Sequence, residues 1–239
     1  MEKLRNYGDR RQTGFCMHCG GSTETKDHAP SRIFLDLPYP SDLPTLPCCA
    51  PCNRSFSQDE EYLGVFIDCV LSGTTDPNHL GREKARKSLS NNESLRARIE
   101  RSKKEADTLG GGKLIVWRPE EARVRNVIVK LARCHAAFEL NEPQLDEPTH
   151  VMFMPLTVMT QEQRQQFEGH PFAGSLAVWP EVGSRAMQRL LIADDAYNEG
   201  WLTVQEGRYR FMAIGAGETV VRGVLSEYLG FEVVWGVTA

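Results

Sequence analysis

The chain has 239 residues, of which 41% are hydrophobic and 25% are charged. This composition is that of a folded globular protein and argues against intrinsic disorder. No apolar run approaches the roughly 20 residues that a membrane-spanning helix needs. The polar start at residues 1–11 lacks the apolar core of a secretory signal. We therefore expect a cytoplasmic protein that has no membrane partner.

The formal net charge of −4 hides an uneven distribution along the chain. Residues 1–81 hold 7 basic and 11 acidic side chains, residues 82–133 hold 15 and 7, and residues 134–239 hold 6 and 14. A basic middle in an acidic chain predicts a surface for a polyanion, although the solvated face of a helix explains the same charge equally well. The candidate nucleic-acid-binding residues crowd together in this segment: Arg96, Arg98, Arg101, Lys103 and Lys104.

The first segment, residues 12–56, is rich in Cys, Pro, Gly and polar residues and poor in helical periodicity, so we expect that it cannot bury much core by itself. Five of the seven cysteines lie between Cys16 and Cys52. An odd number of clustered cysteines in a reducing compartment is typical of metal binding rather than of a disulfide framework. We therefore expect a metal to hold this segment together.

Two CxxC pairs define the expected ligands, Cys16 with Cys19 and Cys49 with Cys52. Each pair lets two thiolates point at one ion, and two pairs complete a tetrahedral shell of four sulfurs. That shell favours zinc, and because it has no open position it predicts a structural rather than a catalytic ion. Cys48 is an alternative ligand that we interpret as a bystander. His18, inside the first pair, is expected to be a solvent-facing spacer.

Between the two pairs, Pro30 favours an extended conformation for the residue before it, so Asp27 and His28 are expected to end a strand. A helix is then predicted to begin at Ser57, because Ser57-Gln58-Asp59-Glu60 has the pattern of a capping box. Apolar residues continue at helical spacing to about Gly73.

In the middle of the chain, residues 78–108 predict one or two polar helices with a break near residues 90–92. Lys113 to Trp117 predicts a strand. Pro119 favours the first turn of a helix, which is expected to run to about Phe138. A charged linker follows at residues 139–148.

From His150 onwards, short apolar runs alternate with turn residues, which predicts strands. Glu206-Gly207 marks a hairpin, and residues 220–229 fit a strand or a helix equally well. The fold class is therefore α+β, with three predicted domains at residues 1–75, 76–140 and 141–239. The other predicted strands are Val151–Val158, Leu176–Trp179, Met187–Ile192, Trp201–Val204, Tyr209–Ile214 and Phe231–Trp235.

The order CxxC, Asp-His-x-Pro and CxxC-Asn resembles the zinc-stapled branch of the HNH endonucleases, which are ββα-metal nucleases. More narrowly, residues 27–34 and 46–62 are similar to an uncharacterised bacterial HNH-like group. The similarity spans roughly residues 13–63, with weaker likeness at residues 200–209 and 227–229.

The resemblance implies a ββα module that hydrolyses phosphodiester bonds of DNA, with RNA left open as a substrate. His28 would be the general base. Asp27 and Asn53 would hold a catalytic Mg²⁺ or Mn²⁺ beside the structural Zn²⁺. The family's middle Asn, which lies before the second cysteine pair, is missing here. Asp42 or Thr45 is expected to orient His28 instead.

Three functions stay open at this point. The first is a DNA-cutting nuclease whose basic middle grips phosphates. The second is a zinc-knuckle module that binds nucleic acid without cutting it. The third is a structural knuckle that serves the C-terminal portion, whose role the sequence does not indicate. A homodimer is also compatible with the sequence.

Overall fold

The structure is a computed structural model that describes residues 7, 14–107, 112–169, 180–192, 200–215 and 217–236. It confirms the α+β class: an N-terminal two-stranded hairpin and helix carry a four-cysteine cluster, helices dominate the middle, and a five-stranded antiparallel sheet follows. The strand predicted at Leu176–Trp179 lies outside the described residues. No helix in the described ranges is long and apolar enough to cross a membrane.

The chain divides into two compact units. Residues 1–55 together with 128–239 form one unit, and residues 56–127 form the other. These boundaries fall inside two helices and differ from those of the three predicted domains, whose independent folding stays a prediction.

The N-terminal hairpin consists of β1 (Thr25–His28) and β2 (Thr45–Cys48), which pair antiparallel so that His28 lies opposite Thr45. The short helix η2 (Arg32–Phe34) follows β1 directly. The prediction that Asp27 and His28 end a strand is thus confirmed. Because side chains alternate along a strand, Thr25 and Asp27 share one face of β1, whereas Lys26 and His28 share the other.

Helix α1 (Ala50–Ser72) begins seven residues earlier than predicted, so the interpretation of Ser57 as its cap was wrong. A carboxylate oxygen of Glu24 accepts a hydrogen bond of 3.0 Å from the amide N–H of Ala50. This acceptor comes from the loop before β1, and a local sequence pattern could not reveal it. The second cysteine pair consequently spans the start of α1.

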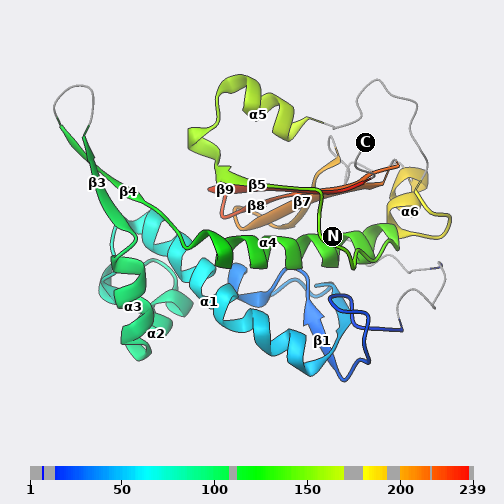
Figure 1. Ribbon diagram of the computed structural model, residues 1–239, viewed down its shortest axis with the longest axis horizontal. Coiled ribbons are helices and arrows are strands. Elements are labelled where there is room, and N and C mark those ends of the chain that lie inside the picture. Colours follow the sequence, from blue (N-terminus) through cyan, green and yellow to red (C-terminus); the bar gives the residue numbers. More distant parts are fainter. Residues whose placement is uncertain are drawn as a thin grey trace. The chain divides into compact units, whose positions relative to one another are not determined.

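In the unit of residues 56–127, the predicted break between two helices is confirmed at Asn92, whose side chain accepts from the N–H of Leu95. The predicted strand at residues 113–117 is also confirmed, but its partner, residues 103–107, was expected to be helical. These two strands form an isolated antiparallel pair that extends away from α2 and α3 (Figure 1). The elements are α2 (Glu83–Asn91), α3 (Glu93–Glu100), β3 (Lys103–Asp107), β4 (Lys113–Trp117) and α4 (Glu121–His135).

The C-terminal sheet has the strand order β5-β9-β8-β7-β6. Residues 219–225 form a strand, which resolves the ambiguity between strand and helix there. Residues 185–192 form α6, so the strand predicted at Met187–Ile192 was wrong. The Ser184 hydroxyl accepts from the N–H of Met187 and starts that helix. The strands are β5 (His150–Pro155), β6 (Leu202–Gln205), β7 (Tyr209–Gly215), β8 (Thr219–Leu225) and β9 (Leu229–Trp235).

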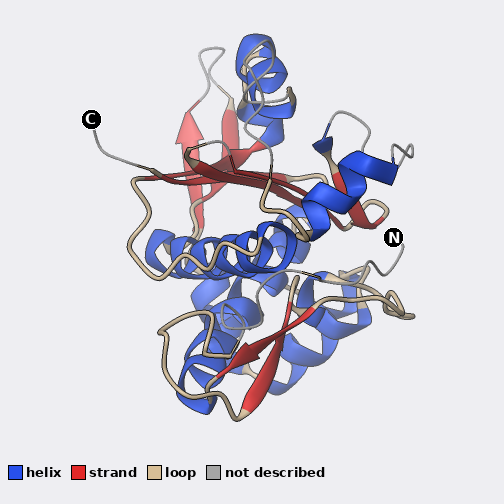
Figure 2. Cartoon of the chain, turned by 90° about the vertical axis from the view of Figure 1, so that its right-hand side faces the viewer, coloured by secondary structure: helices blue, strands red, loops and turns tan. Residues whose placement is uncertain are grey.

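The sheet lies between the end of α4 on one face and α5 (Gln161–Glu168) on the other (Figure 2). His135 stacks on Phe211 with ring centroids 3.7 Å apart and hydrogen-bonds the Tyr209 hydroxyl at 2.8 Å. On the opposite face, Phe167 of α5 packs in a buried cluster with Met212. Both faces of the sheet therefore contribute to the hydrophobic core.

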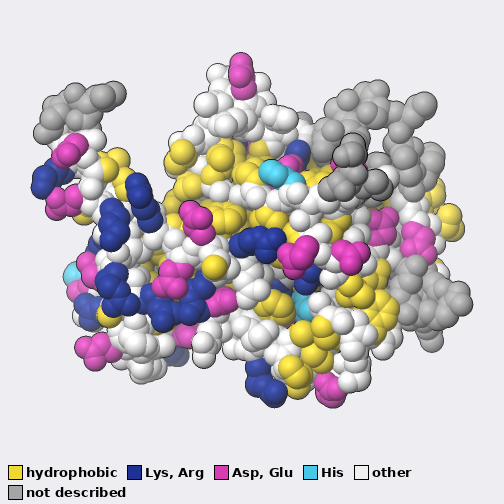
Figure 3. Space-filling view, in the orientation of Figure 1, with side chains coloured by type: hydrophobic (Ala, Val, Ile, Leu, Met, Phe, Trp, Pro, Cys, Tyr) yellow, Lys and Arg dark blue, Asp and Glu magenta, His cyan; other side chains and the backbone are white. Residues whose placement is uncertain are grey.

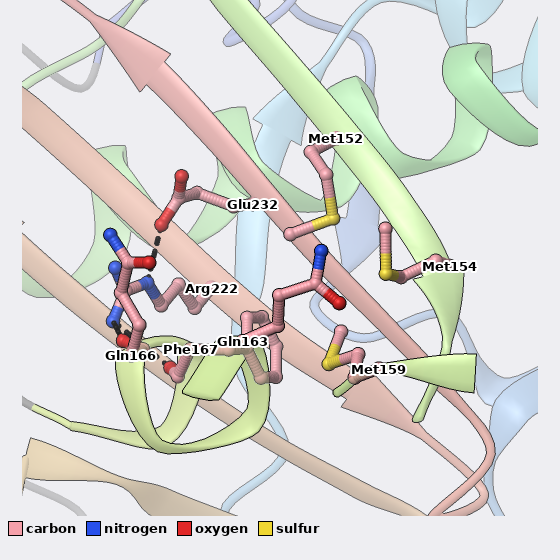
Figure 4. A pocket seen from close by; sticks show the side chains of 8 residues that line it. All are labelled: Met152, Met154, Met159, Gln163, Gln166, Phe167, Arg222 and Glu232. Carbon is pink, nitrogen blue, oxygen red and sulfur yellow. Dashed lines mark hydrogen bonds and ion pairs between the residues drawn. The ribbon is translucent and has the colours of Figure 1, made fainter. Parts of the chain in front are cut away.

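A cavity of about 190 Å³ lies on the α5 side of this sheet. Figure 4 shows methionine side chains on one side of it and the Arg222–Glu232 ion pair on the other. The Arg222 guanidinium also donates to the main-chain carbonyls of residues 166, 167 and 169. These bonds fix the Arg222 side of a pocket that methionines, a phenylalanine and two glutamines also line, and which the sequence did not predict.

Candidate metal centre and the His28 face

The four predicted zinc ligands, Cys16, Cys19, Cys49 and Cys52, come together in the structure with all four sulfurs within 4.8 Å of one another. The sulfurs of Cys19 and Cys49 are 3.8 Å apart. Zinc bonds of about 2.3 Å to a tetrahedron of sulfurs require a sulfur–sulfur distance of about 3.8 Å. The cluster therefore has the geometry to hold a structural metal such as zinc.

The protonation chemistry of the cluster also suits a cation. Burial by itself raises the pKa of Cys16, but N–H donors of Cys49, His18 and Cys19 outweigh it and lower the pKa to about 6. Burial and the neighbouring sulfurs together raise the pKa of Cys52. One thiolate thus forms readily, while Cys52 resists further negative charge. A divalent cation removes that penalty, because it stabilises all four thiolates at once.

Asp27 lies at the centre of a buried network behind β1. One carboxylate oxygen is 3.1 Å from Nε2 of His18 and the other is 2.8 Å from Nζ of Lys130, on α4. The ammonium of Lys130 also donates to Oγ of Ser31 at 2.7 Å and to the carbonyl of His28 at 3.4 Å. Burial raises the pKa of Asp27, but the His18 hydrogen bond and the Lys130 charge outweigh it and lower the pKa. Asp27 is therefore a carboxylate that helps to fix the end of β1.

His18 is consequently not the solvent-facing spacer that we expected, since only 6% of it is exposed. It links the first cysteine pair to Asp27. His18, Asp27 and Cys48 could also hold a metal, because their ligand atoms lie within 4.8 Å of one another. The Lys130 ammonium, however, already supplies a positive charge to that carboxylate.

His28 lies half-buried on the opposite face of β1 from Asp27. Lys26 and Arg32 are exposed, and we call the surface formed by Lys26, His28 and Arg32 the His28 face. Burial, and after it the charge of Arg32, lowers the pKa of His28. The Arg32 guanidinium lies 5.2 Å above the ring centroid of Tyr39, which limits its freedom. A neutral imidazole beside a fixed cation is thus available at neutral pH.

Asn53, in the first turn of α1, lies against the same face of β1 that carries Asp27. Its Nδ2 donates to Oγ1 of Thr25 at 3.3 Å, and that hydroxyl donates to the carbonyl of Cys48 at 2.8 Å. These bonds connect the helix start to both strands of the hairpin. Asn53 therefore lies between the cysteine cluster and β1.

The catalytic Mg²⁺ or Mn²⁺ that the resemblance implies does not fit at Asp27 as the side chains lie. Both carboxylate oxygens are engaged, only 6% of the residue is exposed, and a lysine ammonium is bonded to one of the oxygens. A divalent cation there would be repelled by Lys130. The structure brings Asp27 and Asn53 to one face of β1, but it does not leave Asp27 open as a ligand.

Comparisons with known proteins do not extend these observations. No family model, no curated protein and no solved structure matches this chain.

The five predicted nucleic-acid contacts all lie in the unit of residues 56–127. Arg96, Arg101 and Lys104 are exposed. Arg98 pairs with Glu120 at 3.4 Å, and Lys103 bonds Glu100 at 2.9 Å while its ammonium lies 4.9 Å from the centroid of the Trp117 ring. Of the five, only Arg96, Arg101 and Lys104 thus present their charge mainly to solvent.

The sequence reasoning missed His18, Arg32 and Lys130 as parts of this region. Lys130 is 103 positions from Asp27, and no local pattern connects the two. Arg32 has a weak signal, since it follows the Asp-His-x-Pro motif at the start of a short helix. For His18 the signal was its place inside a CxxC pair, which does not tell which way the ring points.

Proposed function

We propose that this chain is a nuclease in which a zinc-stapled ββα unit hydrolyses phosphodiester bonds of DNA, with His28 as the general base. The observation that carries the proposal is the chemical state of His28. Its imidazole has a lowered pKa, lies on the outward face of β1, and has the Arg32 cation beside it. The topology of hairpin and helix around four cysteines agrees with the ββα module that the motifs imply.

The proposed chemistry uses the His28 face as follows. Arg32 and Lys26 attract a backbone phosphate of the substrate. The neutral His28 imidazole accepts a proton from a water molecule as the water oxygen bonds to phosphorus. The bond from phosphorus to the leaving sugar oxygen then breaks, and that oxygen takes a proton from solvent. A base with a pKa below that of free histidine stays unprotonated, and hence active, at neutral pH.

Lys130 and the cysteine cluster support this role indirectly. Lys130 binds the carbonyl of His28 and the hydroxyl of Ser31, and so holds the turn between His28 and Arg32. The cysteine cluster joins the loop before β1 to the end of β2 and the start of α1. We infer that bound zinc fixes the strand that presents His28 and takes no part in the reaction.

The test is nicking of supercoiled plasmid in buffer with Mg²⁺ or Mn²⁺, the ions that the resemblance predicts. We expect the native chain to nick the plasmid and His28→Ala to lose this activity with its zinc content unchanged. His79→Ala is the matched control, because the His79 side chain is 73% exposed on another element and pairs only locally with Asp76. Full activity of His28→Ala would overturn the proposal.

A second candidate function is a zinc-knuckle module that binds nucleic acid without cutting it. The observation that favours it is the closed state of Asp27, which leaves the implied divalent ion without its carboxylate ligand. In that case native protein and His28→Ala would both retard DNA in a gel and neither would cut it. Absence of DNA binding at low salt would exclude both candidates and leave a structural knuckle.

A further inference from the structure

The antiparallel pair of β3 and β4, which we call the β3–β4 ribbon, has an unusual surface. It pairs with no third strand among the described residues. Leu114 and Ile115, adjacent on β4, are 56% and 58% exposed. Because neighbouring residues of a strand point to opposite sides, each face of the ribbon presents one large apolar side chain to solvent. Two-stranded ribbons are marginally stable in water, so such exposure favours a binding partner.

The charge around the β3–β4 ribbon indicates the class of partner. Figure 3 shows Lys and Arg side chains gathering over α2, α3 and the base of the ribbon. Arg101 precedes β3, Lys104 lies on it, and Arg118 follows β4; all three are exposed. The segment 82–133, which contains the ribbon, has 15 basic and 7 acidic residues. A second copy of this chain would bring like charges together, whereas a polyanion is complementary to them.

The dimensions of the β3–β4 ribbon suit one polyanion in particular. Each strand has five residues, which at about 3.3 Å per residue gives a length of about 17 Å. A two-stranded ribbon fits the major groove of duplex DNA, which is about 12 Å wide. Only one face of the ribbon can meet the base edges, where thymine methyl groups are exposed. We assign this to the face of Leu114, because Ile115 shares the opposite face with the acidic Glu105. The cations at the base of the ribbon would then meet backbone phosphates.

We propose that the β3–β4 ribbon is a duplex-binding arm that enters the major groove, with Leu114 against the bases and Arg101, Lys104 and Arg118 on the phosphates. This inference deepens the proposed function, because it names the form of nucleic acid and the element that holds it. It assigns to the ribbon no part in the hydrolysis itself.

The test is fluorescence anisotropy with a labelled duplex of about 25 base pairs, an ordinary length for one bound protein. Burial of about 55 Å² of apolar surface is worth a factor of about ten in affinity. We therefore expect the double variant Leu114→Ser, Ile115→Ser to bind at least about tenfold more weakly. The matched control is Val158→Ser, Leu191→Ser, which changes two other residues that are each 68% exposed. Circular dichroism should show that both variants are folded.

A salt titration gives a second readout that a purely structural role would not move. Lys104→Gln and Arg118→Gln should each reduce the slope of log affinity against log salt by about 0.9, the value for one phosphate contact. Val158 and Leu191 variants should keep the native slope. An unchanged slope in both charge variants would contradict the assignment of phosphate contacts to the ribbon.

The outcomes separate this inference from the proposed function. If the native chain cuts DNA but the Leu114 and Ile115 variant binds as tightly as the control, only the ribbon assignment fails. If that variant instead changes from dimer to monomer at native DNA affinity, the ribbon joins two copies and the assignment also fails. If the ribbon is required for binding but the native chain does not cut, the hydrolytic proposal fails and the ribbon assignment stands. No binding to duplex at low salt overturns both.

Discussion

Replacement of Lys130 by Met removes the buried ammonium while keeping most of the side-chain volume. Only 1% of Lys130 is exposed, and its Nζ lies 2.8 Å from Asp27 and 2.7 Å from Ser31. After the change, the Asp27 carboxylate stays buried beside Nε2 of His18 at 3.1 Å and the thiol of Cys134 at 4.0 Å, neither of which replaces the ammonium charge. Removing one member of a buried ion pair costs about 3–5 kcal/mol, because the other charge is left uncompensated. We expect a loss of this size in the free energy of unfolding.

The assay is urea unfolding followed by circular dichroism, with zinc content checked for each protein. Asp27→Asn combined with Lys130→Met should be less destabilised than the sum of the two single changes by more than about 1 kcal/mol, as expected for side chains in direct contact. Lys87→Met is the control, because Lys87 is 72% exposed and pairs only with Glu83 on its own helix. It should leave the unfolding transition unchanged.

The Asp27–Lys130 pair also predicts that the free energy of unfolding depends on pH. The lowered pKa of Asp27 contributes stability that is present above the pKa of an unfolded aspartate, about 3.9, and is lost as the pH falls through the folded value. Without Lys130 the pKa of Asp27 should rise, so acid unfolding should begin at a higher pH than in the native chain. A loss under about 1 kcal/mol in Lys130→Met, with additive single changes and an unchanged acid transition, would refute the role of Lys130.

Three further predictions concern the metal, the base and the sheet. Cys52→Ser should lose bound zinc in elemental analysis, because it breaks a four-sulfur shell, whereas Cys48→Ala should keep one zinc per chain. Arg32→Gln should raise the pKa of His28 toward that of free histidine. The acid limb of the single-turnover cleavage rate, measured between about pH 5 and 8, should then move to higher pH. An unmoved limb would show that Arg32 does not set the pKa of His28. Gly223→Ala would place a methyl group against the phenylalanine ring opposite it in β9, so thermal unfolding should show a loss of about 1–3 kcal/mol.

Much of the candidate metal centre was predictable because its information is local. The spacing of the two cysteine pairs fixes which sulfurs can share an ion, and the structure brings those four together. Pro30 likewise indicated that the strand ends at His28, as it does. Within each cysteine pair, and between Pro30 and the residue before it, the constraint acts over a few covalent bonds and is visible in the sequence.

The parts that were missed depend on contacts between distant segments. Helix α1 begins at Ala50 because Glu24, 26 residues away, accepts its N–H, so the capping pattern at Ser57 was misleading. The run at residues 187–192 is short and apolar, and periodicity cannot separate strand from helix in such a run. The engagement of Asp27 by Lys130 is the largest difference for function, since the motif alone implies that Asp27 is open to an ion.

The most direct test of a hydrolytic role for His28 is the single-turnover rate of cleavage of an end-labelled DNA duplex at saturating protein. Saturation removes differences in affinity, so the rate reports on the chemical step alone. With zinc content and duplex affinity equal to those of the native chain, His28→Ala should cleave at least about 100-fold more slowly, the lower range for loss of a general base, while His79→Ala should match the native rate. Equal rates for the native chain and His28→Ala, or no cleavage by the native chain with either Mg²⁺ or Mn²⁺, would contradict the proposed nuclease function.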